Sequence, residues 1–351
     1  MADTANQPKD LLDWAALDRW MDTQDLPPGP IESPELLGGG TQNILIRFSR
    51  GGGDYVLRRP PLHKRAGSDE TMRREARMLA ALADSNVPHP AFMAGCPDES
   101  VLGAAFYLMQ PVDGFNATVA MPSPHRDNPD WRRQMGLSMA EGIAALGQVD
   151  HLAAGLADMD RSQDFLARQV PRWRKQLDSY SQIDGYSGAQ LPDVDAIGRW
   201  LEANRPPDQP PGILHGDCHL ANVMFRHDAP RLAAIVDWEL STIGDPMLDL
   251  GWLLATWPEN DGRTPLEVVN VTPWEGFPDE QTLVAHYAAH SQRDTTAVDW
   301  YAVLACYKLA IILEGTHARA CAGKAPKQTG DLLHQAALIL LERAQTRIHG
   351  R

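Results

Sequence analysis

The chain has 351 residues, 43% of them hydrophobic and 22% charged, which suits one large domain or two lobes with an ample core. Its 32 Lys and Arg against 46 Asp and Glu give a net charge of −14, which argues against a general nucleic-acid binder, because such proteins are usually basic. Four scattered cysteines without a C-x-x-C pair argue against a zinc knuckle and against a disulfide scaffold.

The first residues contain neither a basic segment nor an apolar core, so we expect no signal peptide. No run of about 18 apolar residues occurs, so we expect no membrane span. These features predict a reduced, cytoplasmic enzyme with neither a nucleic-acid nor a membrane partner. They do not indicate an oligomeric state.

The residue pattern in the N-terminal third of the chain predicts a helix, an antiparallel β meander with glycine-rich turns, and a second helix. Prolines after residue 26 must end the first helix, and alternating apolar residues mark the strands. The expected elements are a helix at 9–22, strands at 35–37, 44–48 and 55–58, a helix at 69–83, and two short strands within 101–111 that meet near Gly103.

From about residue 130 onward helical patterns dominate, with one β-rich interruption from Ile213 to Asp237. The expected helices are at 130–148, 163–181, 193–204, 279–292, 297–322 and 331–348. We therefore predict an α+β fold with two lobes. A small antiparallel-β N-lobe covers residues 1–111, and a larger, mostly helical C-lobe covers residues 112–351.

A glycine-rich turn separates the first two strands at Gly39, Gly40, Thr41, Gln42 and Asn43. Glycines let a ligand approach the backbone closely, and consecutive N–H groups at such a turn can hold phosphate oxygens. A plain hairpin turn has the same composition. By itself the turn therefore leaves both interpretations open.

Arg58 and Glu75 form the next candidate pair. Arg58 lies on the strand YVLR and shares a face with Val56. Glu75 lies on an otherwise apolar helix face with Met72 and Leu79, where an unpaired carboxylate is costly. We expect the two side chains to pair beneath the glycine turn, unless Glu75 turns outward to solvent.

The segment ILHGDCHLAN, residues 213–222, concentrates polar chemistry after an apolar run. A metal site would need His215, Cys218 and His219 to converge, and no second His and Cys cluster completes four ligands. A Cys–His nucleophile would need a base that nothing in the sequence specifies. We therefore turn to the remaining polar residues.

Asp217 and Asn222 have the spacing D-x-x-x-x-N, and Asp237 ends an apolar strand twenty residues after Asp217. Phosphoryl transfer needs one carboxylate to orient the attacking hydroxyl, an amide oxygen on Mg²⁺ and a second carboxylate on the metal. The intervening residues read as a hairpin, which predicts that Asp237 returns beside Asn222. By itself Asp237 could also be a helix cap at the end of a strand.

His215-Gly216-Asp217 with Asn222, followed by Ile235-Val236-Asp237, resembles the aminoglycoside phosphotransferase and choline kinase superfamily. This superfamily is similar to the protein kinases in fold, and the likeness covers nearly the whole chain. The helix segment KLAIILEG, residues 308–315, resembles the branch that includes the kinase-like domain fused to some acyl-CoA dehydrogenases.

The resemblance implies ATP and Mg²⁺ as cofactors and a role for each matching residue. Asp217 is expected to be the catalytic base, with Asn222 and Asp237 as Mg²⁺ ligands. Arg58 stands where most members have a lysine on the ATP phosphates, and Glu75 matches its partner. The remaining expected nucleotide-binding residues are Gly39, Gly40, Thr41, Gln42, Asn43 and the hinge residues Met109, Gln110 and Val112. Asp245 and Asp249 are expected to have structural roles.

The expected acceptor is a hydroxyl group on a small molecule. A basic cluster on one predicted helix, formed by Arg168, Arg172, Arg174 and Lys175, could bind an acidic acceptor such as a CoA thioester, or could simply be a solvated face. The branch resemblance favours a hydroxyacyl metabolite. An aminoglycoside, a choline or homoserine-type acceptor, and a nucleotide-binding pseudokinase remain alternatives.

Overall fold

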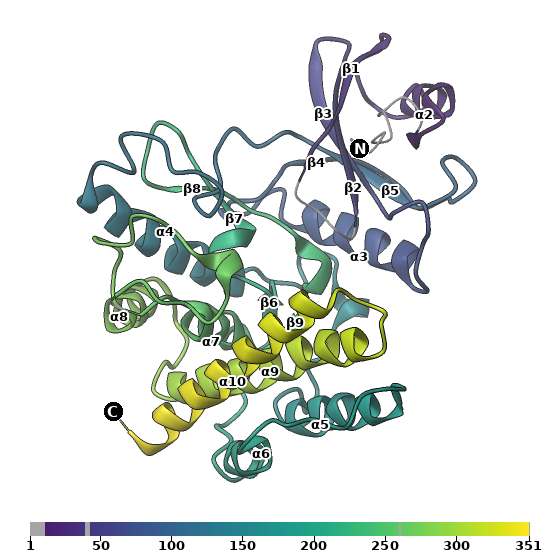
Figure 1. Ribbon diagram of the computed structural model, residues 1–351. Helices are drawn as coiled ribbons and strands as arrows, with labels where there is room; N and C mark the ends of the chain where they lie inside the picture. The colour runs from purple at the N-terminus through teal and green to yellow at the C-terminus, as the bar shows by residue number, and fades with distance from the viewer. Residues whose placement is uncertain (1–10, 39–42, 260, 351) are drawn as a thin grey trace. The chain divides into compact units, whose positions relative to one another are not determined.

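The computed structural model describes residues 11–38, 43–259 and 261–350. The chain forms two compact units, each described by itself below. The first contains the described residues up to Asp113 together with Ala154–Leu156 and Val236–Glu239. All other described residues form the second unit. The architecture is α+β, as predicted: the first unit holds an antiparallel sheet and the second is mostly helical (Figure 1).

The first unit is built on a five-stranded antiparallel sheet with the order β1-β2-β3-β5-β4. Helix α3 lies next to β4 and β5 (Figure 1). Strands β2 and β3 pair without interruption from Ile44↔Arg59 to Arg50↔Gly53, as expected for a tight hairpin. The elements are α2 (Trp14–Met21), β1 (Ile31–Leu36), β2 (Ile44–Arg50), β3 (Gly53–Arg59), α3 (Ser68–Ala81), β4 (Phe92–Cys96) and β5 (Phe106–Met109).

The core of this unit lies between α2 and the sheet. Phe48 stacks on Tyr55 across β2 and β3 with ring centroids 5.4 Å apart. Trp20 from α2 meets Phe106 of β5 edge-on at 4.7 Å. Alternating residues of the strands supply this apolar face, which is what the alternating pattern in the sequence predicts.

The first unit departs from the sequence prediction at its fourth strand. Only β5 forms within 101–111, and Gly103 lies in a turn with a φ of +75°. The partner of β5 is β4, whose sequence FMAGC contains alanine and glycine and has little intrinsic strand preference. Pairing with β5, a tertiary effect, stabilises this strand.

Two other boundaries differ in the same unit. Helix α2 begins at Trp14, where the Asp13 side chain accepts a hydrogen bond from the Ala16 N–H at 2.9 Å and caps the helix. Residues 9 and 10 of the predicted helix lie outside the described residues. Strand β1 begins at Ile31, earlier than the predicted strand, and its pairing is irregular between Glu32 and Glu35.

The second unit is dominated by helices α9 and α10, which run side by side, with α7 packed against α9 (Figure 1). Its elements are α4 (Pro129–Gly147), η1 (Ala157–Met159), α5 (Gln169–Ser179), η2 (Tyr180–Gln182), α6 (Val194–Ala203), β6 (Gly212–Leu214), η3 (Leu220–Asn222), β7 (Val223–Phe225), β8 (Leu232–Ile235), β9 (Thr242–Gly244), α7 (Met247–Thr256), η5 (Glu267–Val269), α8 (Glu280–His290), α9 (Val298–Cys321) and α10 (Lys327–His349). The short η4 (Trp238–Leu240) begins in the first unit and ends where the chain re-enters the second unit at Leu240.

The predicted helices are present in the second unit with shifted ends. Helix α5 begins at Gln169 instead of residue 163, after a turn in which Asp164 has a φ of +52°. Helix α10 begins at Lys327, directly after Pro326. Helix α7 is additional, and every one of its residues is buried.

The β-rich interruption forms two short antiparallel pairs, β6 with β9 and β7 with β8. Val223 pairs with Ile235, so the hairpin predicted between Asn222 and Asp237 is present. Over the residues that the structure describes, no helix is both long enough and apolar enough to cross a membrane.

Candidate active site

The loop between β6 and η3 is held from below by a buried carboxylate. The backbone N–H groups of His215 and Gly216 donate to Asp249 Oδ2 and Oδ1 at 2.6 and 2.8 Å. Gly216 has a φ of +84°, and a Cβ there would lie 2.6 Å from the Leu240 carbonyl oxygen, so only glycine fits. Asp249 therefore fixes the loop backbone, which confirms its expected structural role.

Asp245 has a comparable structural role at the start of α7. Its carboxylate accepts a hydrogen bond from the Met247 N–H at 3.0 Å and from the Tyr301 hydroxyl at 2.6 Å. Both carboxylates are buried, and burial raises their pKa values. Asp249 thus connects the loop to α7, and Asp245 connects the start of α7 to α9.

Asp217 and Asn222 are in direct contact within this loop. The Asn222 Nδ2 group donates to the Asp217 carbonyl oxygen and to Asp217 Oδ2, both at 3.0 Å. His219 Nε2 lies 3.3 Å from Asp217 Oδ1 and supports this carboxylate. Asn116 adds support, because its Nδ2 donates to the Ala221 carbonyl oxygen at 2.7 Å.

The electrostatics keep Asp217 ionised. Burial by itself would raise its pKa, but the hydrogen bond from His219 and the nearby His215 and Lys308 hold the pKa below its usual value. A partly exposed carboxylate that stays ionised can orient a hydroxyl group and accept its proton.

The Asn222 amide is oriented so that its oxygen suits a cation. Both hydrogen bonds of its side chain use Nδ2, and Oδ1 accepts none from the described part of the chain. Amide and carboxylate oxygens are the ligands that Mg²⁺ prefers. The residue therefore fits its expected role as a metal ligand.

In the first unit, Arg58 and Glu75 form the predicted ion pair. Arg58 Nε lies 2.9 Å from Glu75 Oε2, and the Tyr107 hydroxyl donates to the same oxygen at 2.9 Å. Glu75 is fully buried. Burial raises its pKa to about 7, against the opposing effects of Arg58 and Tyr107.

Asp237 is the second carboxylate on Arg58. Its Oδ1 lies 2.6 Å from Arg58 Nη2, and its side chain is 39% exposed. Its φ of +67° is unusual for a residue other than glycine. Such strain concentrates at functional positions, so the backbone geometry supports a functional role rather than that of a simple strand cap.

The remaining predicted nucleotide-binding residues are described in part. Gly39, Gly40, Thr41 and Gln42 lie outside the described residues, and Asn43 directly precedes β2. At the hinge, Met109 ends β5 and the Gln110 N–H donates to the Ala91 carbonyl oxygen at 2.8 Å. That N–H is therefore engaged within the protein. Val112 follows in an irregular, partly exposed segment.

The cysteine and histidine alternatives for the loop are not supported. Cys218 is buried, and burial raises the pKa of its thiol well above the usual value, so it is not a thiolate nucleophile. The two His–carboxylate clusters at metal-ligand distances within the described residues involve other positions: Glu141 with His286 and His290, and Glu314 with His317 and His334.

The sequence did not point to Lys308 as a residue of the site. Its Nζ donates to the Gly216 carbonyl oxygen at 3.3 Å and lies 4.3 Å from the centre of the Trp252 ring. Burial lowers its pKa to about 8, although Asp217 and Asp249 raise it. A lysine inside the apolar run of α9 is the signal that could have identified it.

The residues of the predicted basic cluster make separate local contacts. Arg174 pairs with Asp195 and lies 3.7 Å from Asp178, so its charge is largely compensated. Arg168 donates to the Arg161 carbonyl oxygen, and Arg172 lies over the Trp173 ring at 5.2 Å. Local ion pairs therefore support the interpretation as a solvated helix face.

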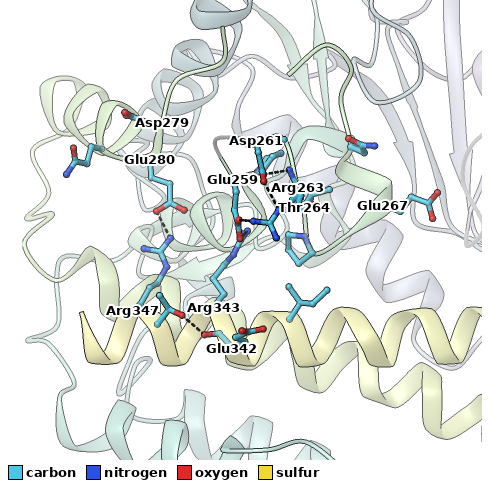
Figure 2. Close-up of a pocket in the computed structure, with 17 residues that line it drawn as sticks. Glu259, Asp261, Arg263, Thr264, Glu267, Asp279, Glu280, Glu342, Arg343 and Arg347 are labelled. Atoms are coloured by element: carbon cyan, nitrogen blue, oxygen red, sulfur yellow. Dashed lines mark hydrogen bonds and ion pairs between the residues drawn. The ribbon is translucent and has the colours of Figure 1, made fainter. Parts of the chain in front are cut away.

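A cavity of about 1320 Å³ opens elsewhere in the second unit, and Figure 2 shows its charged residues facing one another. Arg263 pairs with Glu259 and Asp261, and Arg347 pairs with Glu280. None of the predicted site residues lines it. Its charges are used in these ion pairs, so it gives no support to a reaction site.

Residues 34–273 match the model of the phosphotransferase enzyme family. The chain belongs to this family. A solved structure described as a putative aminoglycoside phosphotransferase from Ralstonia eutropha is 29% identical, covers 95% of this chain and 99% of its own, and has a TM-score of 0.78. A macrolide 2′-phosphotransferase type I has a TM-score of 0.58 at 18% identity, covers 93% of this chain and 95% of its own, and shares the fold.

Among curated proteins, this family member is similar to acyl-CoA dehydrogenase family member 11 of Gallus gallus, with 30% identity over 86% of the chain. It is also 28% identical to acyl-CoA dehydrogenase family member 10 of Mus musculus over 86% of the chain. The match spans only 38% and 28% of those relatives. The predicted likeness to the dehydrogenase-associated branch is therefore confirmed.

Proposed function

We propose that the protein is an ATP- and Mg²⁺-dependent phosphotransferase that acts on a hydroxyl group of a small molecule. The observation that carries this proposal is the Asp217–Asn222 pair. A loop anchored by Asp249 presents an ionised carboxylate and, beside it, an amide oxygen that accepts no hydrogen bond from the described residues. Phosphoryl transfer needs this combination of a base and a metal ligand.

In the proposed reaction, the acceptor oxygen forms a bond to the γ-phosphorus of ATP, and the bond from that phosphorus to the β–γ bridging oxygen breaks. The electron pair of the broken bond leaves with ADP. Asp217 accepts the hydroxyl proton, and His219 and Asn222 hold its carboxylate in place. Bound Mg²⁺ would neutralise phosphate charge, with Asn222 and Asp237 as its protein ligands.

The remaining site residues bind the nucleotide in this proposal. Arg58, oriented by Glu75, binds the phosphates, because a guanidinium is always charged and can bind two oxygens at once. The family resemblance assigns phosphate binding to the segment from Gly39 to Asn43, and we assign adenine binding to backbone groups at Met109, Gln110 and Val112. Since the Gln110 N–H is already bonded to Ala91, the Val112 N–H is the donor that we assign to the base.

We infer that the acceptor is a hydroxyacyl metabolite. Support comes from the curated relatives that are named as acyl-CoA dehydrogenase family members. The structural relatives named as phosphotransferases of aminoglycosides and macrolides, and an ethanolamine kinase of Plasmodium vivax, keep amine acceptors as the second candidate. A pseudokinase that binds nucleotide without transfer is the remaining alternative.

Asp217→Asn tests the catalytic proposal. We expect phosphoryl transfer to fall by roughly 10²–10⁴-fold, because an amide cannot accept the hydroxyl proton, while Mg·ATP affinity stays within about twofold. ATP turnover with a panel of hydroxyacyl-CoAs and aminoglycosides measures transfer, and calorimetry measures nucleotide binding. Equal turnover by the wild type and the variant would contradict the proposal. Absent Mg·ATP binding by the wild type would remove both the kinase and the pseudokinase interpretations.

A further inference from the structure

Lys308 places an ammonium group next to the residue that precedes the proposed catalytic base. It comes from α9, and its Nζ donates to the carbonyl oxygen of Gly216, the residue directly before Asp217. It also contributes to the lowered pKa of Asp217. Any acceptor whose hydroxyl group reaches Asp217 therefore meets this charge.

Two tryptophans surround the same ammonium group. Its Nζ lies 4.3 Å from the centre of the Trp252 ring of α7 and 5.5 Å from that of Trp173 of α5. Aromatic faces at these distances are what a protein uses to bind a quaternary or protonated amine. Here the protein's own lysine already occupies the aromatic faces.

Lys308 and Trp252 have more hydrogen-bond donors than the acceptors that surround them in the described residues. The ammonium has three N–H donors, and the long contact to Gly216 is its one hydrogen bond within the described residues. No ion pair of Lys308 forms among those residues. The Trp252 Nε1 atom is also buried and has no partner there. Buried donors without acceptors are costly, and oxygen atoms of a ligand would satisfy them.

We propose that Lys308 selects the acceptor: it excludes amines from the aromatic faces of Trp173 and Trp252 and binds an oxyanion of a negatively charged hydroxy compound. This inference rests on the proposed phosphotransferase function and specifies its substrate class. The oxyanion is a carboxylate or phosphate oxygen, which a free hydroxy acid or its CoA thioester would supply. Residue Lys308 thus acts on specificity and not as the base.

The experiment compares wild type, Lys308→Met, Lys308→Arg and the control Lys324→Met, which removes an exposed charge just beyond α9. The acceptors are 3-hydroxybutyrate, 3-hydroxybutyryl-CoA, choline and kanamycin. Transfer from labelled ATP gives kcat and KM, and calorimetry gives the Kd of each acceptor. Mg·ATP binding reports on the fold of each variant.

We expect wild-type protein to bind an anionic acceptor, and Lys308→Met to raise its KM and Kd at least about tenfold, because a hydrogen bond to a charged group is lost. The ATP KM should change little, and the anionic acceptors should lose more in KM than in kcat. Lys308→Arg should recover most of the affinity, and Lys324→Met should match wild type. The acid and the thioester distinguish the two sources of the oxyanion.

Three results would overturn the inference. The first is a higher kcat/KM for choline or kanamycin than for both anionic compounds in the wild type. The second is an unchanged KM and Kd for the anionic compounds in Lys308→Met, and the third is that the wild type binds neither anionic compound. Each of them leaves the phosphotransferase function standing as long as Mg·ATP binds and any acceptor is phosphorylated. A wild-type protein that neither binds Mg·ATP nor phosphorylates any acceptor would instead refute the proposed function itself.

Discussion

Arg58 is a buried side chain that links two carboxylates of the first unit. It contacts two carboxylates, Glu75 at 2.9 Å and Asp237 at 2.6 Å, through different nitrogens of its guanidinium. A lysine has a single nitrogen and could not reproduce this fork. The arginine that departs from the usual lysine of the family is therefore matched to its surroundings, and the departure by itself does not argue for an inactive protein.

Removing this charge should destabilise the protein. We expect Arg58→Met to lower the free energy of unfolding by about 3 kcal/mol at pH 8, because it leaves Glu75 buried without its cation. Urea unfolding measures the loss. Arg47→Met is the matched control in the same sheet: its ion pair with Asp54 is about half exposed on both sides and should contribute no more than about 1 kcal/mol.

The Arg58→Met deficit should depend on pH. The pKa of Glu75 is raised to about 7, so its contribution to stability is greatest below the unfolded pKa and is lost as pH rises through 7. Without Arg58 its pKa rises further, and the carboxyl group is neutral over a wider range. The difference between variant and wild type should therefore shrink as pH falls from 8 to 5.5. A deficit that is constant over this range would contradict the assignment.

At the scale of elements, the position of the loop that carries Asp217 depends on the packing of α7 against α9. Asp249, which holds the loop backbone, lies on α7, and Lys308 lies on α9. A Cβ at Gly251 of α7 would lie 2.5 Å from the backbone carbon of Tyr301 on α9. The two helices therefore approach so closely that only glycine is accommodated, and this approach sets the distance between loop and lysine.

Gly251→Ala should separate the two helices. We expect a loss of about 1–3 kcal/mol in unfolding free energy, because overpacking forces the backbone to shift, together with a reduced kcat from displacement of the loop. Gly38→Ala is the control, since a Cβ there meets nothing within 4 Å and the position does not have a positive φ. Thermal unfolding and turnover are measured for both. Wild-type stability in Gly251→Ala would show that the helix contact is looser than described.

At the scale of the whole molecule, the net charge of −14 would by itself favour a cationic acceptor. The local arrangement outweighs that average, because an interaction at hydrogen-bond distance in a buried setting is much less screened than one across the surface. The position of Lys308 is therefore a better guide to the acceptor than the composition of the chain.

Nucleotide binding should stabilise the folded chain as a whole. At a Mg·ATP concentration of about 100 times its Kd, we expect a gain of about 2.7 kcal/mol, seen as a rise in the melting temperature of roughly 5 °C. Asp237→Asn should remove the part of this rise that depends on Mg²⁺, while the effect of ATP with EDTA stays as in the wild type. An equal Mg²⁺-dependent rise in both proteins would count against Asp237 as a metal ligand.

The sequence was sufficient to predict those features that depend on neighbouring residues and on their chemistry. Alternating strands β2 and β3, the amphipathic helix α3 with its one costly carboxylate, and the close spacing of Asp217 and Asn222 could all be read from neighbouring residues. The pairing of Arg58 with Glu75 followed because a buried carboxylate needs a cation.

Other features were decided only by the tertiary structure. Strand β4 forms because β5 pairs with it, and α7 is buried on every side, so its sequence lacks the polar face that marks an amphipathic helix. The contacts of Lys308 bring together three helices and a loop that are far apart in the sequence. The sequence thus determined which reaction we propose for the loop. The charge that an acceptor meets was decided by packing, because contacts between distant segments leave no periodic pattern along the chain.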